Sequence, residues 1–225
     1  GSADQTIRIW DVQERRCLAI LRGSSDEVYG LALSPDGGTL ASACKDGVVA
    51  FWSALPRAEE EQLRLISLGR FVGNAVAPVA FAPDSRVLAA PREGSVSVFD
   101  PETSKEIDQV PALGTGDVHM VTYSPEGTLL VSGSANGKIR VWSCAERRLL
   151  QVLNRHKEQI RLLRFRADGA RLLSLDAKGK AIWWDTVTWQ AGPTFVVELT
   201  GGAAVSPDGR LLVISAKGAM RWLNA

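Results

Sequence analysis

Hydrophobic and polar positions along the chain follow one phrase that returns about every forty residues. In "LALSPDGGTLASACKDGVVAFW", two apolar runs with a polar turn between them are followed by another turn and a run that ends on tryptophan. The turn proline or its replacement falls at Pro35, Pro83, Pro125, Ala167 and Pro207, and the closing aromatic at Trp10, Trp52, Phe99, Trp142, Trp184 and Trp222. Two independent landmarks keep the same period, which indicates a chain built from repeats.

Each repeat predicts a small antiparallel sheet. The sequence Ser-Pro-Asp-Gly fixes φ at proline and lets glycine take a positive φ, so it joins two strands such as Tyr29–Ser34 and Thr39–Cys44. A second turn at Lys45–Gly47 contains the Asp-Gly pair typical of a hairpin. A third strand ends on the tryptophan and a fourth follows, as in Cys17–Gly23. No segment has a convincing helical period, and Arg57–Leu65 is expected to widen a loop.

The opening stretch "GSADQTIRIWD" predicts a strand over Thr6–Val12 that has large side chains at both alternate sets of positions. Four strands alone cannot bury two apolar faces. Sheets stacked face to face around an axis can do so, and they leave only short edges. We therefore expect both faces of this strand to be covered by neighbouring sheets.

The stretches "GSADQTIRIWD", "TLASACKDGVVAFW", "LLVSGSANGKIRVW" and "AIWWD" resemble WD40 repeats, and the resemblance covers essentially the whole chain. It implies an all-β fold, a β-propeller of four-stranded antiparallel blades, with about five and a quarter blades of a seven-bladed ring present. The expected single domain 1–225 comprises a half blade (1–23), four blades (24–71, 72–113, 114–154 and 155–195) and a three-stranded last blade (196–225). Because the chain opens on a third strand, we expect it to be truncated at its N-terminus and to belong to a multidomain protein.

The resemblance also implies a hydrogen-bonded set in each blade, formed by a His before the first strand, a Ser in the second, an Asp at the hairpin and the closing Trp. The matching residues are Ser2, Asp4, Trp10, Ser42, Asp46, Trp52, Ser132, Trp142, His156, Ser174 and Trp184. Ser24 and Gly114 stand where a His is expected, and Lys178 stands where an Asp is expected. We therefore expect no blade to hold the complete set.

Composition narrows the classes of function. The 225 residues are 45% apolar with a net charge of +1, so they can bury a core but create no overall field that favours nucleic acid or membranes. No apolar run approaches the ~20 residues of a membrane-spanning helix. Cys17, Cys44 and Cys144 lie far apart and form no zinc motif, which favours small buried thiols in a reducing compartment, and we expect the cytoplasm. No phosphate-binding loop or other cofactor motif is present, so we expect no catalytic, cofactor or metal site.

Candidates for partner binding are the residue that opens each first strand and the residue two positions earlier. These are Glu27, Tyr29, Asp117, His119, Gln159 and Arg161. In proteins that the repeats resemble, this rim is a frequent contact surface, and Tyr and Arg commonly dominate binding energies. A plain surface role is the alternative for His119. Arg164 stands where other repeats have Ala or Thr, so we expect it to pair with a carboxylate or to line a wet central channel.

Charge is unevenly distributed along the chain. The segment Lys138–Lys180 holds 12 Lys and Arg residues against 4 Asp and Glu residues, whereas Leu55–Glu126 holds 6 against 11. Charged loops that keep the molecule soluble are one interpretation. An acidic or phosphorylated partner on the basic segment is the other.

The sequence therefore predicts a non-catalytic scaffold or sensor platform that binds a peptide or protein on its rim, with no nucleic-acid partner. The alternative is a regulatory propeller appended to an upstream catalytic domain, such as a kinase or a nucleotide-driven switch. The fold alone does not decide between them, because such folds have many unrelated functions.

Overall fold

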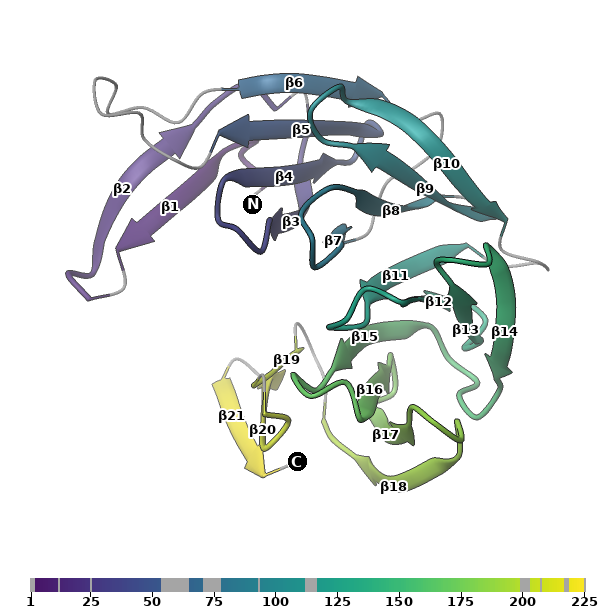
Figure 1. Ribbon diagram of the computed structural model, residues 1–225. Helices are drawn as coiled ribbons and strands as arrows, with labels where there is room; N and C mark the ends of the chain where they lie inside the picture. The colour runs from purple at the N-terminus through teal and green to yellow at the C-terminus, as the bar shows by residue number, and fades with distance from the viewer. Residues whose placement is uncertain are drawn as a thin grey trace. The chain divides into compact units, whose positions relative to one another are not determined.

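The computed structural model describes residues 3–11, 13–24, 26–53, 65–70, 78–92, 94–111, 117–198, 203–206, 208–216 and 219–224. These residues form 21 β-strands in antiparallel sheets and contain no helix (Figure 1). They fall into two compact units, Gly1–Pro111 and Ala112–Ala225. The predicted all-β fold of four-stranded antiparallel blades is confirmed, and the single domain stays a prediction.

The first unit contains a two-stranded sheet followed by two four-stranded sheets. Its strands are β1 (Ile7–Asp11), β2 (Arg16–Leu21), β3 (Val28–Leu33), β4 (Thr39–Cys44), β5 (Val48–Ser53), β6 (Leu65–Arg70), β7 (Ala80–Phe81), β8 (Leu88–Arg92), β9 (Ser95–Asp100) and β10 (Lys105–Pro111). Consecutive strands are neighbours within each sheet. The loop expected over Arg57–Leu65 lies, up to residue 64, outside the described residues.

The second unit contains two four-stranded sheets and one three-stranded sheet. Its strands are β11 (Val118–Tyr123), β12 (Leu129–Ser134), β13 (Ile139–Ser143), β14 (Arg148–Leu153), β15 (Ile160–Phe165), β16 (Arg171–Asp176), β17 (Lys180–Asp185), β18 (Ala191–Val196), β19 (Ala203–Val205), β20 (Leu211–Ala216) and β21 (Ala219–Asn224). Strand β18 ends one residue beyond the boundary expected at 195.

The Ser-Pro-Asp-Gly turn shows how the sequence produces these hairpins. The Ser34 hydroxyl donates to Asp36 Oδ1 at 2.5 Å, and the same oxygen accepts the backbone N–H of Gly38 at 2.9 Å. The hydrogen bond from Ser34 is the main reason that the pKa of Asp36 is lowered. Gly37 has a φ of +72°, a conformation that glycine adopts without strain.

The core consists of side chains pressed between neighbouring sheets of one unit. In β17, Ile182 and Trp184 pack toward β11–β14, whereas Ala181 and Trp183 pack with Leu212 of the three-stranded sheet. Successive side chains of a strand point to opposite faces, so one strand supplies both interfaces. This alternation explains why the third strand of a repeat is apolar at nearly every position.

Strand β1 differs from this pattern. Ile7 is fully buried against the sheet of β3–β6, but Trp10 on the other face is 57% exposed and Arg8 is exposed as well. The expectation that both faces of the opening strand are covered is therefore wrong for the described residues, because no described sheet packs on the face that carries Trp10.

Candidate functional site

Three of the rim residues predicted from the sequence occupy equivalent bulges in the edge strands of their sheets. Val28 pairs with Cys44 and Gly30 with Ala43, so Tyr29 is the extra residue between two ladder positions of β3. His119 has the same place in β11 and Arg161 in β15. A bulge turns its extra side chain away from the regular alternation of the strand. These three sheets therefore each present one side chain at the same point.

The residues two positions before the bulged residues connect each bulge to the neighbouring hairpin through backbone hydrogen bonds. The carbonyl oxygens of Glu27, Asp117 and Gln159 accept backbone N–H groups at 2.9, 2.9 and 2.8 Å. The donors are Lys45, Ala135 and Ala177, each in the turn after the second strand of its sheet. These bonds hold the start of each edge strand through main-chain atoms, which leaves the side chains free to vary.

In the second unit, His119 is partly buried and lies in the field of two charged neighbours. Burial is the main cause that lowers the pKa of His119, the charge of Arg161 lowers it further, and Asp117 opposes both. The imidazole is therefore neutral at pH 7. Arg161 is exposed, and the described residues provide no ion pair for it. Within the described part of the chain, the guanidinium of Arg161 is therefore an exposed cation without an ion pair, next to the neutral imidazole of His119.

In the first unit, the equivalent position forms a hydrogen-bonded group of three. The Tyr29 hydroxyl donates to Glu27 Oε2 at 2.7 Å, and Lys45 Nζ lies 3.4 Å from Glu27 Oε1. The hydrogen bond from Tyr29 is the main cause that lowers the pKa of Glu27. Tyr29 remains 42% exposed, so it can still contact a partner.

Several cations of the basic segment already have carboxylate partners. Arg148 pairs with Glu146, Arg166 with Asp168, and Lys178 with Glu158. The hydrogen bond from Arg166 lowers the pKa of Asp168 to about 2. Such exposed pairs contribute little to stability, but they reduce the charge that is available to a ligand.

Arg164 lies on β15, three residues beyond Arg161 on the same edge strand, and its side chain is exposed. No carboxylate within the described ranges forms an ion pair with it. The pairing considered from the sequence is therefore absent from this part of the chain, and Arg164 extends the uncompensated positive charge along β15.

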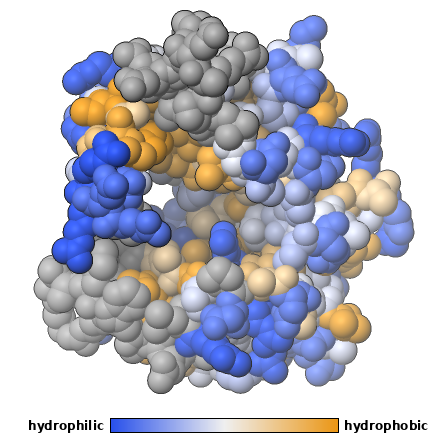
Figure 2. Space-filling model, turned by 60° about the vertical axis from the view of Figure 1, so that its left-hand side comes forward, coloured by the Kyte–Doolittle hydropathy of each residue, from blue (hydrophilic) through white to orange (hydrophobic). Residues whose placement is uncertain are grey.

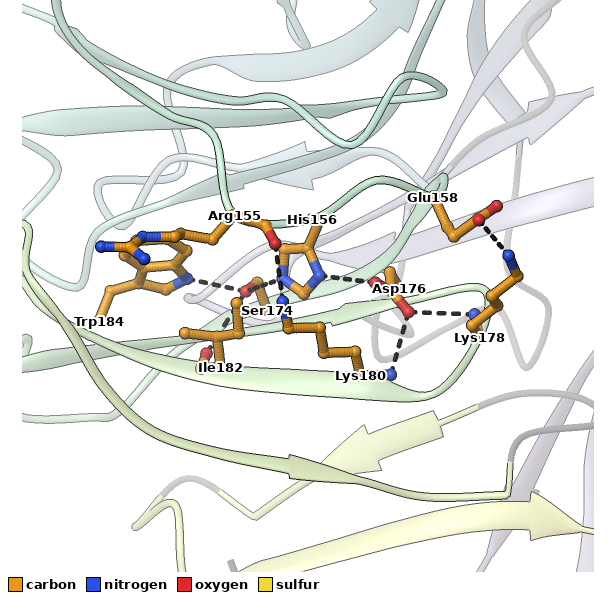
Figure 3. A network of polar contacts seen from close by, with 9 residues as sticks. All are labelled: Arg155, His156, Glu158, Ser174, Asp176, Lys178, Lys180, Ile182 and Trp184. Atoms are coloured by element: carbon orange, nitrogen blue, oxygen red, sulfur yellow. Dashed lines mark hydrogen bonds and ion pairs between the residues drawn. The ribbon is translucent and has the colours of Figure 1, made fainter.

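A buried polar network lies in the blade of β15–β18, to which Arg161 and Arg164 also belong (Figure 3). Trp184 Nε1 donates to Ser174 Oγ at 2.8 Å, Ser174 Oγ lies 2.7 Å from His156 Nε2, and His156 Nδ1 lies 2.8 Å from Asp176 Oδ2. Asp176 Oδ1 accepts the backbone N–H groups of Lys178 and Lys180, both at 3.0 Å. This blade therefore holds a complete set, and the expectation that Lys178 leaves it without a carboxylate is wrong. Asp176 supplies the carboxylate from the end of β16, two residues earlier.

Aspartate, histidine and serine occur here in the order of a hydrolase triad, but the surroundings do not suit catalysis. Ser174 is fully buried and His156 is 2% exposed, so a substrate cannot reach the hydroxyl. The Ser174 oxygen also accepts the indole N–H of Trp184. The network thus joins β16, β17 and the turn between them to the segment that precedes β15.

The other blades hold parts of the predicted structural set. Trp52 Nε1 donates to Ser42 Oγ at 3.0 Å, and Trp142 Nε1 to Ser132 Oγ at 3.5 Å. Asp46 accepts the backbone N–H of Val48. In the first blade, Asp4 bonds Thr6 and Arg8, Trp10 is exposed, and Ser2 lies outside the described residues.

The burial of His156 predicts that stability depends on pH. Burial lowers the pKa of His156 from its ordinary value of 6.5, against the opposing effect of Asp176. The folded chain therefore binds this proton less readily than the unfolded chain, so the stabilisation is complete above about pH 6.5 and is lost as the pH falls below it. We expect the urea midpoint to fall from pH 7.5 to pH 5.5, and to fall less steeply in His156→Gln. His119→Gln is the control, because His119 is less buried than His156. If the urea midpoints of wild type and His156→Gln fell in parallel as the pH is lowered, His156 would not be the source of the pH dependence.

The stacked four-stranded antiparallel sheets, each with an aromatic residue closing its third strand, define a β-propeller repeat protein. The family model described as WD domain, G-beta repeat matches residues 15–53 and 111–143. The chain therefore belongs to the WD40-repeat family, whose members generally act as non-catalytic scaffolds that bind protein partners.

Similar proteins are longer than this chain. Transducin beta-like protein 3 of Bos taurus is 31% identical over 90% of this chain and 25% of its own length. Small ribosomal subunit protein RACK1y of Oryza sativa is 28% identical over 63% of this chain and 42% of its own. WD repeat and HMG-box DNA-binding protein 1 of Xenopus laevis is 30% identical over 70% of this chain and 14% of its own length. The chain thus spans less than half of the length of each.

Within the described ranges, no cluster of three or more His, Cys, Asp or Glu side chains is arranged to hold a metal ion. None of the described segments is a helix of the length and apolarity needed to cross a membrane.

Proposed function

We propose that this chain is a binding module that holds an acidic or phosphorylated segment of a protein partner at the bulge of β15. The observation that supports it best is Arg161, which is exposed and has no ion pair among the described residues, beside the neutral imidazole of His119. Guanidinium groups bind carboxylates and phosphates through paired hydrogen bonds. Arg164 adds a second cation on the same strand. The three cysteines are free, in keeping with the proposed cytoplasmic location. Only Cys44 is buried and Cys17 is exposed, so the expectation of three buried thiols is wrong.

Charge reversal of Arg161 tests this proposal. The ligands are a fluorescein-labelled Glu-rich peptide, its phosphoserine counterpart and a labelled DNA duplex, each titrated by fluorescence anisotropy. We expect Arg161→Glu to weaken binding of the two peptides by at least about tenfold, since Arg is often the anchor of an interface. The melting temperature is expected to stay unchanged, because Arg161 is exposed and has no partner in the described part of the chain.

Arg171→Glu is the matched control, because Arg171 is exposed at the opposite end of the same sheet. Equal losses in both variants would mean that peptides respond only to net charge. Unchanged binding in Arg161→Glu would reject the site. Tighter binding of the duplex than of either peptide would overturn the expectation of a protein partner, a result of interest because one relative is named as DNA-binding.

A further inference from the structure

Strand β14 is the outer strand of the sheet β11–β14, and no described strand pairs with its outer edge (Figure 1). On its other side it pairs with β13, from Ser143↔Arg148 to Ile139↔Leu153. An edge strand points the N–H and C=O groups of alternate residues away from its neighbour, where a further strand can bind them. The sheet already has all four strands of its repeat, so this open edge is a feature of a complete blade.

Two other outer edge strands carry residues that oppose the addition of a strand. Strand β18 contains Pro193, which has no backbone N–H, and β10 contains the charged residues Lys105, Glu106 and Asp108. Between residues 149 and 153, β14 has no charged residue, no proline and no glycine. Its edge therefore lacks the features by which proteins commonly prevent strand pairing.

Two aliphatic side chains of β14 are open to solvent. Leu150 is 38% exposed and Val152 is 42% exposed. Exposed apolar side chains are common on proteins, and Figure 2 shows several among hydrophilic residues on one face of this chain. Their exposure is therefore not sufficient to mark a site. What sets Leu150 and Val152 apart is that they lie on a strand whose backbone edge is also open.

Charge distinguishes this edge from an otherwise equivalent one. Leu150 is the extra residue of a bulge in β14, and Ile107, which is 53% exposed, has the same place in β10. The segment Arg147–Lys157 holds four Lys and Arg residues and no Asp or Glu, whereas Glu102–Asp108 holds three Asp and Glu residues and one Lys. An acidic segment would thus be attracted to β14 and repelled from β10.

The cations at the end of β14 are attached to a fixed backbone. Arg155 and Lys157 follow the strand, are exposed, and form no ion pair with a carboxylate among the described residues. The carbonyl oxygen of Arg155 accepts a hydrogen bond from Lys180 Nζ at 2.8 Å, and His156 between the two cations is bound in the buried network (Figure 3). This end of the open edge is therefore positively charged and held in place.

We propose that the outer edge of β14 binds an extended segment of a partner protein, which adds to the sheet as a further strand. The segment has apolar residues beside Leu150 and Val152 and acidic residues beside Arg155. Main-chain hydrogen bonds hold it to the edge, and these side chains select its sequence. The three ladders of this sheet are antiparallel, so the acidic residues lie at the N-terminal end of the segment. This surface is separate from the site at Arg161 and does not depend on it.

Backbone methylation of a peptide tests for strand addition without changing the protein. The probe is a fluorescein-labelled peptide with a Glu-rich N-terminus followed by alternating Val and Thr, titrated into the full chain by fluorescence anisotropy. Two derivatives carry N-methyl groups on one or the other alternate set of amides in the Val-Thr part. Only one set can face β14, so we expect one derivative to lose at least about tenfold in affinity and the other to bind like the parent. Equal affinities of the two derivatives, whether retained or lost, would reject strand addition.

Hydrogen exchange locates the bound peptide. We expect exchange of the β14 amides to slow when the parent peptide is added, because the outer edge becomes hydrogen-bonded and is shielded from water. The amides of β18, whose edge contains Pro193, are the internal control and should exchange at an unchanged rate. Protection of β18 without protection of β14 would overturn the assignment.

Leu150→Asp tests the apolar contact, and the exposure of Leu150 makes this variant compatible with folding. We expect it to raise the Kd of the parent peptide at least about tenfold, because it places a carboxylate against an apolar and acidic segment. Ile107→Asp, at the equivalent bulge of β10, is the matched control and should leave the Kd unchanged. The inference fails if Leu150→Asp has no effect.

Arg155→Glu and Arg161→Glu distinguish this surface from the site of the proposed function. We expect Arg155→Glu to weaken binding of the peptide and Arg161→Glu to leave it unchanged. If Arg161→Glu weakened binding more than Arg155→Glu, the peptide would occupy the other site and the inference would fail. It would also fail if the chain alone formed a dimer in sedimentation velocity that Leu150→Asp dissociated, since a second copy would then be the occupant.

Discussion

Replacing Trp184 with alanine is expected to lower the free energy of unfolding by about 3–5 kcal/mol. The indole is 2% exposed and packs in the core cluster between two sheets, with Val141 and Leu172 among its members. Its removal leaves a cavity and takes away the N–H donor that Ser174 Oγ accepts at 2.8 Å. Ser174 in turn bonds His156, so the loss reaches the buried polar network. Chemical denaturation followed by circular dichroism measures the change.

Trp10→Ala is the matched control for this prediction, because the same residue type closes the equivalent strand of the first repeat. Trp10 is 57% exposed, so its truncation should change stability by less than about 0.5 kcal/mol, as is usual for surface sites. If both variants lost the same stability, burial between sheets would not be the source of the effect.

Gly179→Ala is expected to have a comparable or larger effect, above about 4 kcal/mol. Gly179 has a φ of +80°, and a Cβ added there would lie 1.8 Å from the carbonyl oxygen of Val197. That neighbour is backbone and cannot move aside easily, since the N–H of Val197 donates to Gly179 O at 2.8 Å. The substitution must therefore distort the hairpin between β16 and β17 or break this contact. We expect a strongly lowered denaturation midpoint or a loss of soluble protein.

Gly37→Ala separates the two contributions. Gly37 has nearly the same backbone conformation, with a φ of +72°, but no atom lies within 4 Å of an added Cβ. Only the left-handed strain remains, which costs about 1–2 kcal/mol. A Gly37→Ala variant as unstable as Gly179→Ala would show that backbone conformation, rather than the contact with Val197, dominates.

The repeat phrase was sufficient to predict the sheets. Pro35 and Trp52 mark a turn and a strand end whose chemistry is local, so their positions carry over directly into β3–β5. The exposure of Trp10 could not be predicted in the same way. Burial depends on which sheet lies against a face, and the local pattern of β1 is the same as that of the buried strand β13.

The carboxylate of the buried network was missed although a signal was present. Ser174 and Asp176 are two residues apart on β16, and side chains at that spacing share a face of a strand. The WD40 pattern places the Asp at the hairpin, where this chain has Lys178. Strand periodicity would have placed Asp176 beside Ser174 and within reach of His156. The bulges at Tyr29, His119 and Arg161 had no such signal, because they arise from the pairing register between strands.

At each bulge, the side chain that can contact a partner is separate from the backbone groups that hold the strands together. This separation affects how such a chain can evolve. Each bulged residue lies outside the ladder, and its neighbourhood is held by main-chain bonds such as that from Ala177 N–H to Gln159 O. A mutation at this position therefore changes the side chain that is available to a partner and leaves the pairing between the strands intact. Tyrosine, histidine and arginine already occupy three equivalent bulges. Duplicated repeats can in this manner acquire new partners by single substitutions, without a compensating change in the core.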